Sequence, residues 1–206
     1  MNACETMSEP PRVVIDACVL AGSVRRHIIT LLVSEGCFSP VVSEEILQET
    51  EGAIPKTLRN SDFTADEQVA YTREVMSLLR RFFSSSVSDV DTSELLKTSR
   101  RLPDPDDEHV LGLAITTGAS MIVTDNLKDF PLKALSDFDI KPISTDQFVV
   151  LLLSRNRHAA ADLIRRLQAA LNWSDDDRPH ICRTLRRVGL KHTAKVLSHM
   201  SGTSTD

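Results

Sequence analysis

The segment RVVID, Arg12 to Asp16, decides the fold class, because three consecutive apolar residues in it end in a carboxylate. A short, continuously apolar run is typical of a strand buried on both faces of a parallel sheet. An acid directly after such a strand lies at the carboxyl edge of the sheet, where ligands bind in α/β folds. Burying a carboxylate there costs free energy unless it is paired or binds a cation. Asp16 is therefore predicted to be functional.

Outward from this segment, strand and helix patterns alternate. Short apolar runs predict strands at 38–42, 87–90, 120–124 and 140–143. Periodic or capped stretches predict helices at 23–35, 43–51, 64–83, 93–101, 106–117 and 145–153, with loops at 52–63 and 126–131. Alternating strands and helices predict an α/β fold with a central, mostly parallel sheet flanked by helices.

The helix predicted at 64–83 has the clearest amphipathic pattern. Its apolar positions Val69, Met76, Leu79 and Phe83 recur at intervals of seven, three and four. This spacing predicts one buried face along a long surface helix.

Residues 155–206 differ from the rest of the chain in charge. Residues 1–154 carry 14 Lys and Arg against 24 Asp and Glu, whereas 155–195 carry 10 against 4. Apolar stripes predict helices at 160–171, 179–189 and 192–200. We therefore expect a domain at 1–154 and a helical C-terminal extension at 155–206 that packs on it. The basic extension favours contact with a polyanion, an acidic partner or the acidic domain itself, and an ordinary solvated helix face explains the charge equally well.

Composition excludes several other classes of protein. The longest apolar run, Phe148–Leu153, is far shorter than a membrane span, and residues 1–11 lack a signal-peptide pattern. A cytoplasmic protein without a membrane partner is therefore expected. The four cysteines, at positions 4, 18, 37 and 182, lack metal-binding spacing, so neither a disulfide framework nor a zinc site is predicted.

Acidic residues recur at the ends of four separate predicted elements. They are Asp16 after the first strand, Glu45 and Glu49 on one helix face, Asp104, Asp106 and Asp107 at a helix start, and Asp125 and Asp129 after a later strand. These positions share one edge of a parallel sheet. Clustered carboxylates repel one another unless cations bind them, and oxygen ligands without His or Cys favour Mg²⁺ or Mn²⁺. Such ions suit phosphoryl transfer.

Several of these acids have an equally good structural interpretation. Asp106 is a plausible helix N-cap, Asp104 a turn residue between prolines, and Glu45 a surface acid that favours the helix dipole. His109 and the other histidines show no metal-ligand spacing and are interpreted as ordinary residues.

Four blocks of sequence, in this order and spacing, resemble one known family. They are VVIDACVL at 13–20, SEEILQET at 43–50, DPDDEHVLGLA at 104–114 and IVTDNLKDF at 122–130. Together they resemble the PIN-domain nucleases, in particular the VapC-type toxins of bacterial toxin–antitoxin pairs. The tail resembles the helical C-terminal extension of one VapC subgroup.

The resemblance implies a PIN-like fold and a metal-dependent endoribonuclease that uses Mg²⁺ or Mn²⁺. It would act on RNA (tRNA, rRNA or mRNA) as the toxin of a type II toxin–antitoxin system, with a cognate antitoxin as inhibitor and a homodimer as a further expectation. By position, the family's acids fall on Asp16, Glu49 and Asp107. The fourth falls on Asn126, a departure from the usual acid, with Asp129 and also Asp125 near enough to restore charge.

The implied site therefore has Asp16, Glu49, Asp107, Asn126 and Asp129 as catalytic residues, the four acids among them as metal ligands. One well-held ion is expected rather than two. Basic residues of the tail, Arg165, Arg166, Arg186 and Arg187, would contact RNA phosphates without reading bases.

Two rival functions follow from the same residues. A phosphatase of the haloacid dehalogenase type also begins with an Asp after a buried strand, but it needs a second Asp at the position of Cys18. A PIN-like module that binds RNA or protein without cleaving is favoured only by Asn126.

Overall fold

The structure is a computed structural model, and it describes residues 10–87, 102–155, 165–166, 169 and 178–199. These residues fall into two compact units, which are described separately. One unit contains Pro11–Gly22 and the described residues within 38–143. The other contains Ser23–Cys37 and the described residues from Ser144 onward.

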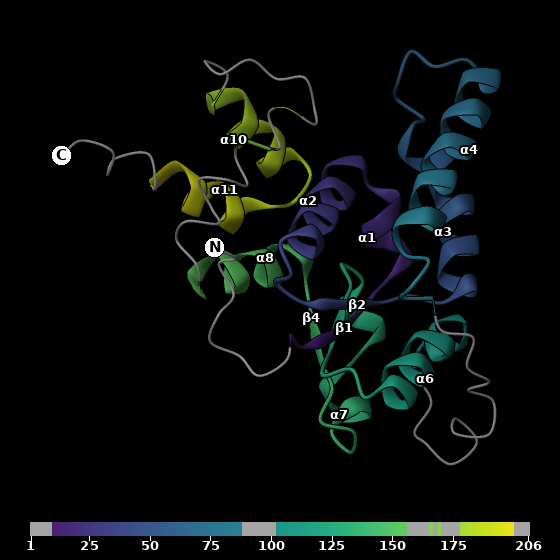
Figure 1. The fold of residues 1–206 in the computed structure, drawn as a ribbon, viewed down its shortest axis with the longest axis vertical. Helices are drawn as coiled ribbons and strands as arrows, with labels where there is room; N and C mark the ends of the chain where they lie inside the picture. Colours follow the sequence, from purple (N-terminus) through teal and green to yellow (C-terminus); the bar gives the residue numbers. More distant parts are fainter. Residues whose placement is uncertain (1–9, 88–101, 156–164, 167–168, 170–177, 200–206) are drawn as a thin grey trace. The chain divides into compact units, whose positions relative to one another are not determined.

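The first unit is built around a four-stranded sheet (Figure 1). Its strands are β1 (Arg12–Ile15), β2 (Ser39–Val41), β3 (Met121–Val123) and β4 (Lys141–Ile143). The spatial order is β2-β1-β3-β4, and every neighbouring pair is parallel. Val13, Val14 and Ile15 are fully buried, as the apolar run predicted. The α/β class with a parallel sheet is confirmed.

The strand order places a topological switch point between β1 and β3. From β1 the chain first moves to β2 on one side, and later returns to form β3 on the other side of β1. Connections at such a point leave the sheet in opposite directions, which opens a crevice beyond the carboxyl ends of the two strands. Asp16 and Thr124 are the residues that follow those ends.

Helices and short 3₁₀ turns connect the strands of this unit. They are α1 (Ala17–Ala21), α3 (Glu44–Thr57), α4 (Ala65–Phe82), η1 (Pro105–Asp107), α6 (Glu108–Thr117), η2 (Leu127–Asp129) and α7 (Leu132–Leu135). Helix α1 packs on α3, α3 packs on α4, and α6 contacts β1 and β3. The sequence pattern predicted neither α1 nor α7, because helices of four or five residues are too short to show periodicity.

Helix α3 extends further than the sequence predicted. The expected loop at 52–63 is wrong over 52–57, since the helix continues through Gly52 and Pro55 to Thr57, whereas 58–63 lie outside helices as predicted. Ser43 caps its start as expected, with its Oγ accepting from the N–H of Ile46. The fully buried Ile54 continues the face of Ile46 and Leu47, so tertiary packing outweighs the one backbone hydrogen bond that a proline near the helix end removes.

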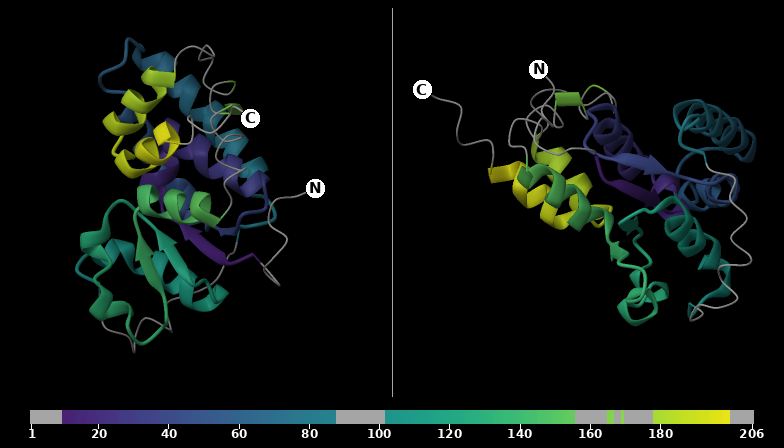
Figure 2. Two further views of the ribbon diagram at one scale, coloured as in Figure 1. Left: turned by 90° about the vertical axis from the view of Figure 1, so that its left-hand side faces the viewer. Right: turned by 60° about the horizontal axis from the view of Figure 1, so that its bottom comes forward.

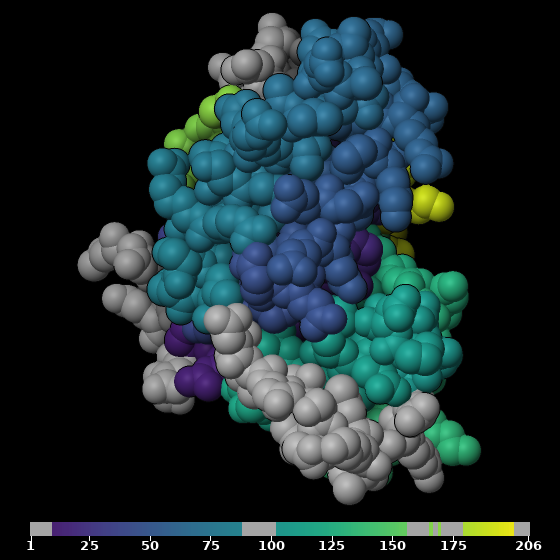
Figure 3. Space-filling model, turned by 90° about the vertical axis from the view of Figure 1, so that its right-hand side faces the viewer, coloured from purple at the N-terminus to yellow at the C-terminus, as the bar shows by residue number. Residues whose placement is uncertain are grey.

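Helix α4 confirms the predicted long amphipathic helix but buries a different set of residues. Thr64 and Glu67 form a capping box at its start. Thr72, Val75, Met76 and Leu79 are buried, whereas Val69 is 56% exposed, so its assignment to the buried face is wrong. Figure 3 looks onto the outer surface of α4.

The second unit consists of helices. They are α2 (Ser23–Ser34), α8 (Thr145–Arg155), α10 (Arg178–Arg187) and α11 (Lys191–His199). Helix α11 packs on both α10 and α8, as Figure 2 shows. Arg25 of α2 donates to the carbonyl of Val188 at 2.5 Å. Helices α10 and α11 confirm the two short helices predicted at 179–189 and 192–200.

Some predicted elements lie outside the described residues. These are most of the strand at 87–90, the helix at 93–101 and the stripe at 160–171. Val87 itself forms one parallel bridge with Val42. Among the helices that the structure describes, none is long and apolar enough to cross a membrane.

Candidate metal centre

Asp16 occupies the centre of the switch point. Its N–H donates to the carbonyl of Val123 at 3.1 Å, which continues the β1–β3 ladder by one residue and aligns Asp16 with Thr124. Asp16 is almost fully buried although it is an ionisable residue, because it directly follows the buried strand. Its position at the sheet edge is therefore fixed by backbone pairing on one side and by helix α1, which begins at the next residue, on the other.

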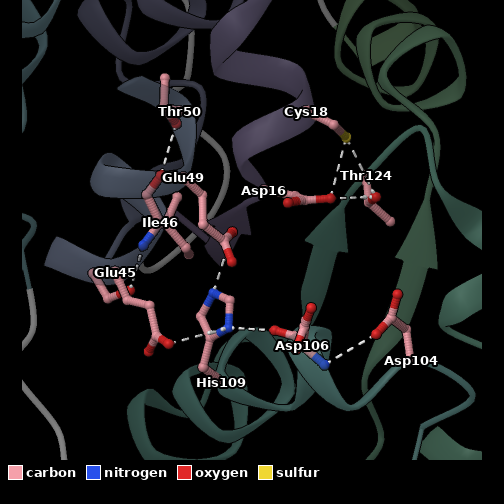
Figure 4. A network of polar contacts seen from close by, with 11 residues as sticks. Asp16, Cys18, Glu45, Ile46, Glu49, Thr50, Asp104, Asp106, His109 and Thr124 are labelled. Atoms are coloured by element: carbon pink, nitrogen blue, oxygen red, sulfur yellow. Dashed lines mark hydrogen bonds and ion pairs between the residues drawn. The ribbon is translucent and has the colours of Figure 1, made fainter. Parts of the chain in front are cut away.

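Two side chains orient the carboxylate of Asp16 (Figure 4). The hydroxyl of Thr124 donates to Asp16 Oδ2 at 2.5 Å, and the thiol of Cys18 donates to the same oxygen at 3.1 Å. Thr124 Oγ1 also accepts the N–H of Asn126 at 3.0 Å. Among the described residues no hydrogen bond reaches Asp16 Oδ1, so one oxygen is anchored and the other remains available to a ligand.

Three carboxylates meet beside this position. Asp104, Asp107 and Asp129 each offer one oxygen, and these oxygens all lie within 4.8 Å of one another. They come from two segments: Asp104 precedes η1 and Asp107 ends it at the start of α6, and Asp129 ends η2. Asp104 also caps η1 by accepting the N–H of Asp106 at 3.1 Å. Asp107 makes no capping bond with its side chain, so its carboxylate is not used by the helix.

Asp107 shows most directly how strongly these charges interact. Its pKa is raised to about 6, first because burial disfavours the charged form and then because of the negative charges of Asp16, Asp129, Asp104 and Glu49. Four carboxylates therefore act on this side chain, one from its own segment and three from elsewhere in the chain. A cation bound among them would stabilise the charged form of Asp107 and so oppose this rise in pKa.

Glu49 and His109 form a second, adjacent pair (Figure 4). His109 Nδ1 lies 2.7 Å from the carbonyl of Asp106, which can only accept, so Nδ1 carries the proton. Its Nε2, buried and without a hydrogen bond, then faces Glu49 Oε2 at 3.5 Å. Burial raises the pKa of Glu49; His109 opposes this shift, and the charges of Asp16, Glu45 and Asp106 add to it.

Asn126 contacts the cluster through Asp129. Its Nδ2 donates to Asp129 Oδ2, and Lys128 Nζ lies 3.8 Å from the same oxygen. Since a carboxylate only accepts, the amide nitrogen must face it, and the carbonyl oxygen of Asn126 points elsewhere. Asn126 thus holds Asp129, which is largely buried, in place.

The predicted site residues lie close together, but only two of them belong to the group of three converging carboxylates. Asp107 and Asp129 share the group of three, while Asp16 and Glu49 lie near enough to raise the pKa of Asp107 but outside that group. Asp106 and Asp125 are exposed, and Glu45 is 3.8 Å from His109.

His109 and Thr124 were missed as functional candidates in the sequence, and Asp104 was considered among the converging acids but left out of the expected ligand set. Asp104 was interpreted as a turn residue, His109 as ordinary, and Thr124 was not singled out. The spacing of Asp104 and Asp107 at i and i+3 in a helix start could have indicated convergence. Only the pairing of β1 with β3 reveals the contact of Thr124 with Asp16.

The comparison with known families identifies this arrangement. A family model for the PIN domain matches residues 12–128, which is more than half of the chain; the match includes β1, the acidic helix start and β3, and ends one residue before Asp129. The chain belongs to the PIN-domain family. Searches of the curated proteins and of the solved structures gave no match.

PIN domains are in general metal-dependent nucleases, so a nucleic acid is the implied substrate and a divalent metal ion the implied cofactor. The residues of this PIN domain fit such an ion. The donor set consists of carboxylate oxygens alone, which suits a hard divalent cation, and the pKa of Asp107 is raised by burial and then by the neighbouring carboxylates.

Proposed function

We propose that this protein is a Mg²⁺- or Mn²⁺-dependent endoribonuclease and the toxin of a type II toxin–antitoxin system. The observation that carries the first part is the convergence of Asp104, Asp107 and Asp129 within 4.8 Å, beside the buried Asp16. The second part rests on the resemblance of the four sequence blocks to VapC-type toxins. RNA as substrate and an antitoxin as partner imply a cytoplasmic protein.

In this proposal Asp107 and Asp129 bind the ion directly, and Asp16 and Glu49 complete its surroundings directly or through water. Asp104 joins them, which adds one residue to the set expected from the sequence. Thr124 and Cys18 hold Oδ2 of Asp16, which leaves its other oxygen for the ion or its water. Asn126 keeps Asp129 oriented, and His109 Nε2 lies 3.5 Å from Glu49 Oε2.

When bound, the metal ion supplies polarisation of the scissile phosphate and a water molecule of lowered pKa for in-line attack. The protein contributes the position of that ion and a substrate site beside it. No side-chain nucleophile is needed, and the products would carry a 5′-phosphate and a 3′-hydroxyl, as the family resemblance implies.

The direct test is cleavage of a structured RNA by the purified protein with Mg²⁺, with Mn²⁺ and with a chelator. We expect cleavage only with metal, and its loss in Asp16→Asn and Asp107→Asn. Asp62→Asn is a matched control, because Asp62 is an exposed acid in a loop outside the cluster. Intact RNA at millimolar Mn²⁺ would exclude the nuclease.

The antitoxin is proposed to dock on α4 and the loop before it. Four large apolar side chains of this segment are exposed, namely Phe63, Val69, Leu78 and Phe82. Exposed large apolar side chains on a surface helix are typical of a protein interface, and an antitoxin bound to α4 would cover them.

Expression in a bacterial host tests the toxin role. Without a partner protein, the wild type is expected to arrest growth, and Asp16→Ala to relieve the arrest at equal protein level. Normal growth with the wild type would contradict the toxin role while leaving nuclease activity in vitro untouched.

A PIN domain that binds RNA without cleaving it is the second candidate. Asn126, at a position where the family usually has an acid, is the observation that favours it. RNA binding that persists with no cleavage at any metal concentration would establish this alternative. The family match leaves the dehalogenase-type phosphatase without support.

A further inference from the structure

The last described segment of the chain carries charge of one sign only. Residues 178–199 contain six Lys and Arg and no Asp or Glu. Five of these side chains are described and exposed, and we call them the basic surface: Arg183, Arg186, Arg187, Lys191 and Lys195. They belong to α10 and α11, which pack on one another.

Helical spacing explains why the cations of α10 share a face. Arg183, Arg186 and Arg187 are three and four residues apart, which places neighbouring side chains about 5–6 Å from one another on a helix surface. The opposite face is buried through Ile181, Cys182 and Leu185. Because that apolar face packs inward, the arginines on the other face are exposed to solvent.

Helix α11 repeats this division after a tight turn. Gly189, at a φ of 89°, reverses the chain, and Leu190 N–H donates back to the carbonyl of Leu185 at 2.8 Å. Ala194 and Leu197 are buried, which leaves Lys191 and Lys195 on the exposed side. Both helices thus present their cations outward from one small apolar core.

The basic surface has no carboxylate partner among the described residues. Other cations of the chain do: Arg80 pairs with Glu44 and Glu51, and Arg166 pairs with Glu35 at 2.6 Å. Like charges at this spacing repel one another and destabilise a helix. A polyanion bound across the surface would remove this repulsion.

We infer that the basic surface binds the phosphate backbone of single-stranded RNA and so holds the substrate of this PIN domain. The inference rests on the proposed function for the nature of the substrate. Arginine suits the role, because its planar guanidinium donates two parallel hydrogen bonds to a phosphate. Contacts of this kind position a nucleic acid without reading its sequence.

An acidic protein fits the same surface less well. Protein interfaces have an apolar or aromatic centre and are depleted in lysine. No large apolar side chain of α10 or α11 is exposed in the part of these helices that the structure describes, in contrast to α4. A surface of cations alone favours a backbone of regularly spaced charges.

The test measures binding of a labelled single-stranded RNA of about 20 nucleotides, long enough for several contacts, by fluorescence anisotropy. A chelator is present, so that cleavage cannot occur. The triple variant Arg183→Gln, Arg186→Gln, Arg187→Gln is expected to bind at least about tenfold more weakly than the wild type at moderate salt. The slope of log K against log salt concentration should fall by about 2, since each phosphate contact on a single strand contributes about 0.7.

Further variants test whether a loss of RNA affinity comes from the basic surface itself, from the change in net charge or from loss of folding. Lys56→Gln, Arg59→Gln, Arg73→Gln removes three exposed cations from α3, α4 and the loop between them, and is expected to change affinity by less than about threefold. Replacing the three arginines by lysine should restore most of the binding. If the glutamine variant has lost its helical circular dichroism, Lys191→Gln, Lys195→Gln is used in its place.

We call the glutamine variant of Arg183, Arg186 and Arg187 the tail variant, and that of Lys56, Arg59 and Arg73 the matched control. Equal losses of RNA affinity in the two would overturn the inference, because net charge alone would then explain binding. So would wild-type affinity in the tail variant, or tighter binding of polyglutamate than of RNA by the wild type. Failure of the proposed function is a separate result: the wild type would bind RNA through the basic surface but not cleave it with Mn²⁺. In an active enzyme, the tail variant should raise KM and leave kcat unchanged.

Discussion

Asp107 and Asp146 are both acids at the start of a helix, yet their surroundings are opposite. Asp146 of α8 accepts four bonds of 2.8 Å from His192 and Thr193, two on each carboxylate oxygen. These bonds lower its pKa although burial opposes the shift. The pKa of Asp107 is instead raised to about 6 by burial and by other carboxylates.

The difference separates a structural acid from a candidate functional one. Asp146 caps the N-terminus of α11, so its charge is already stabilised by backbone N–H groups and by the helix dipole. Asp107 caps nothing with its side chain, and its neighbours are charges of its own sign. Only the second acid gains by binding a cation.

The largest effect is expected from Asp107→Asn. Loss of this ligand should reduce metal-dependent RNA cleavage about a thousandfold, a change of about 4 kcal/mol in transition-state stabilisation. The metal-free variant should melt at the same temperature as the wild type or above it, because repulsion within the cluster is relieved. Cleavage assays and thermal melts in chelator measure both effects, and wild-type activity would refute the assignment of Asp107 as a ligand.

Asp146→Ala should show the reverse pattern. It leaves the N–H groups of His192 and Thr193 without their acceptor, at an expected cost of about 2–4 kcal/mol in the free energy of unfolding. Chemical denaturation followed by circular dichroism measures this cost, with Gln147→Ala as a control in the same helix turn. Because folded Asp146 has a lowered pKa, its contribution is present above pH 4 and is lost as the pH falls below that value. A stable variant would show that Asp146 does not hold α11.

Thr124→Val tests whether orientation of Asp16 matters in addition to its charge. The variant keeps the shape of the side chain but removes the donor to Asp16 Oδ2. Partners of metal ligands typically change affinity or activity by 10- to 100-fold, so a loss of about that size is expected. Cleavage rates titrated with Mn²⁺ measure it, and Thr116→Val, on exposed α6 surface, is the control. An unaffected rate would mean that the strand pairing alone positions Asp16.

The smallest effect is the pH dependence of metal binding. Asp107 carries a proton below pH 6, and an ion must displace it, so Mn²⁺ affinity should weaken by about tenfold per pH unit below 6 and level off above. Conversely, the metal-free protein should lose stability as the pH rises from about 4 to 6, since its folded form holds this proton more tightly than the unfolded chain. Calorimetric titration at several pH values tests this, and Asp107→Asn should flatten the curve between pH 5 and 6.

Sequence alone was enough for features that depend on local pattern. The strand ending at Asp16, the Ser43 cap of α3 and the amphipathic helix α4 follow from apolar periodicity and capping chemistry, which act within a few residues. The sequence also predicted that acids from four elements lie near one another, because the carboxyl ends of parallel strands share one edge of the sheet.

Only the tertiary structure decided how those acids combine. Which oxygens meet depends on contacts between distant segments: Asp104 and Asp107 precede β3 in the chain and meet Asp129, which follows it, and Thr124 reaches Asp16 because β3 pairs with β1. Likewise, Pro55 stays helical because Ile54 is buried, and Val69 is exposed because Thr72 and Val75 contribute the buried face instead. Local propensity is worth tenths of a kcal/mol per residue, whereas burial and like-charge repulsion act across the fold with larger energies, so they settle what the sequence pattern leaves open.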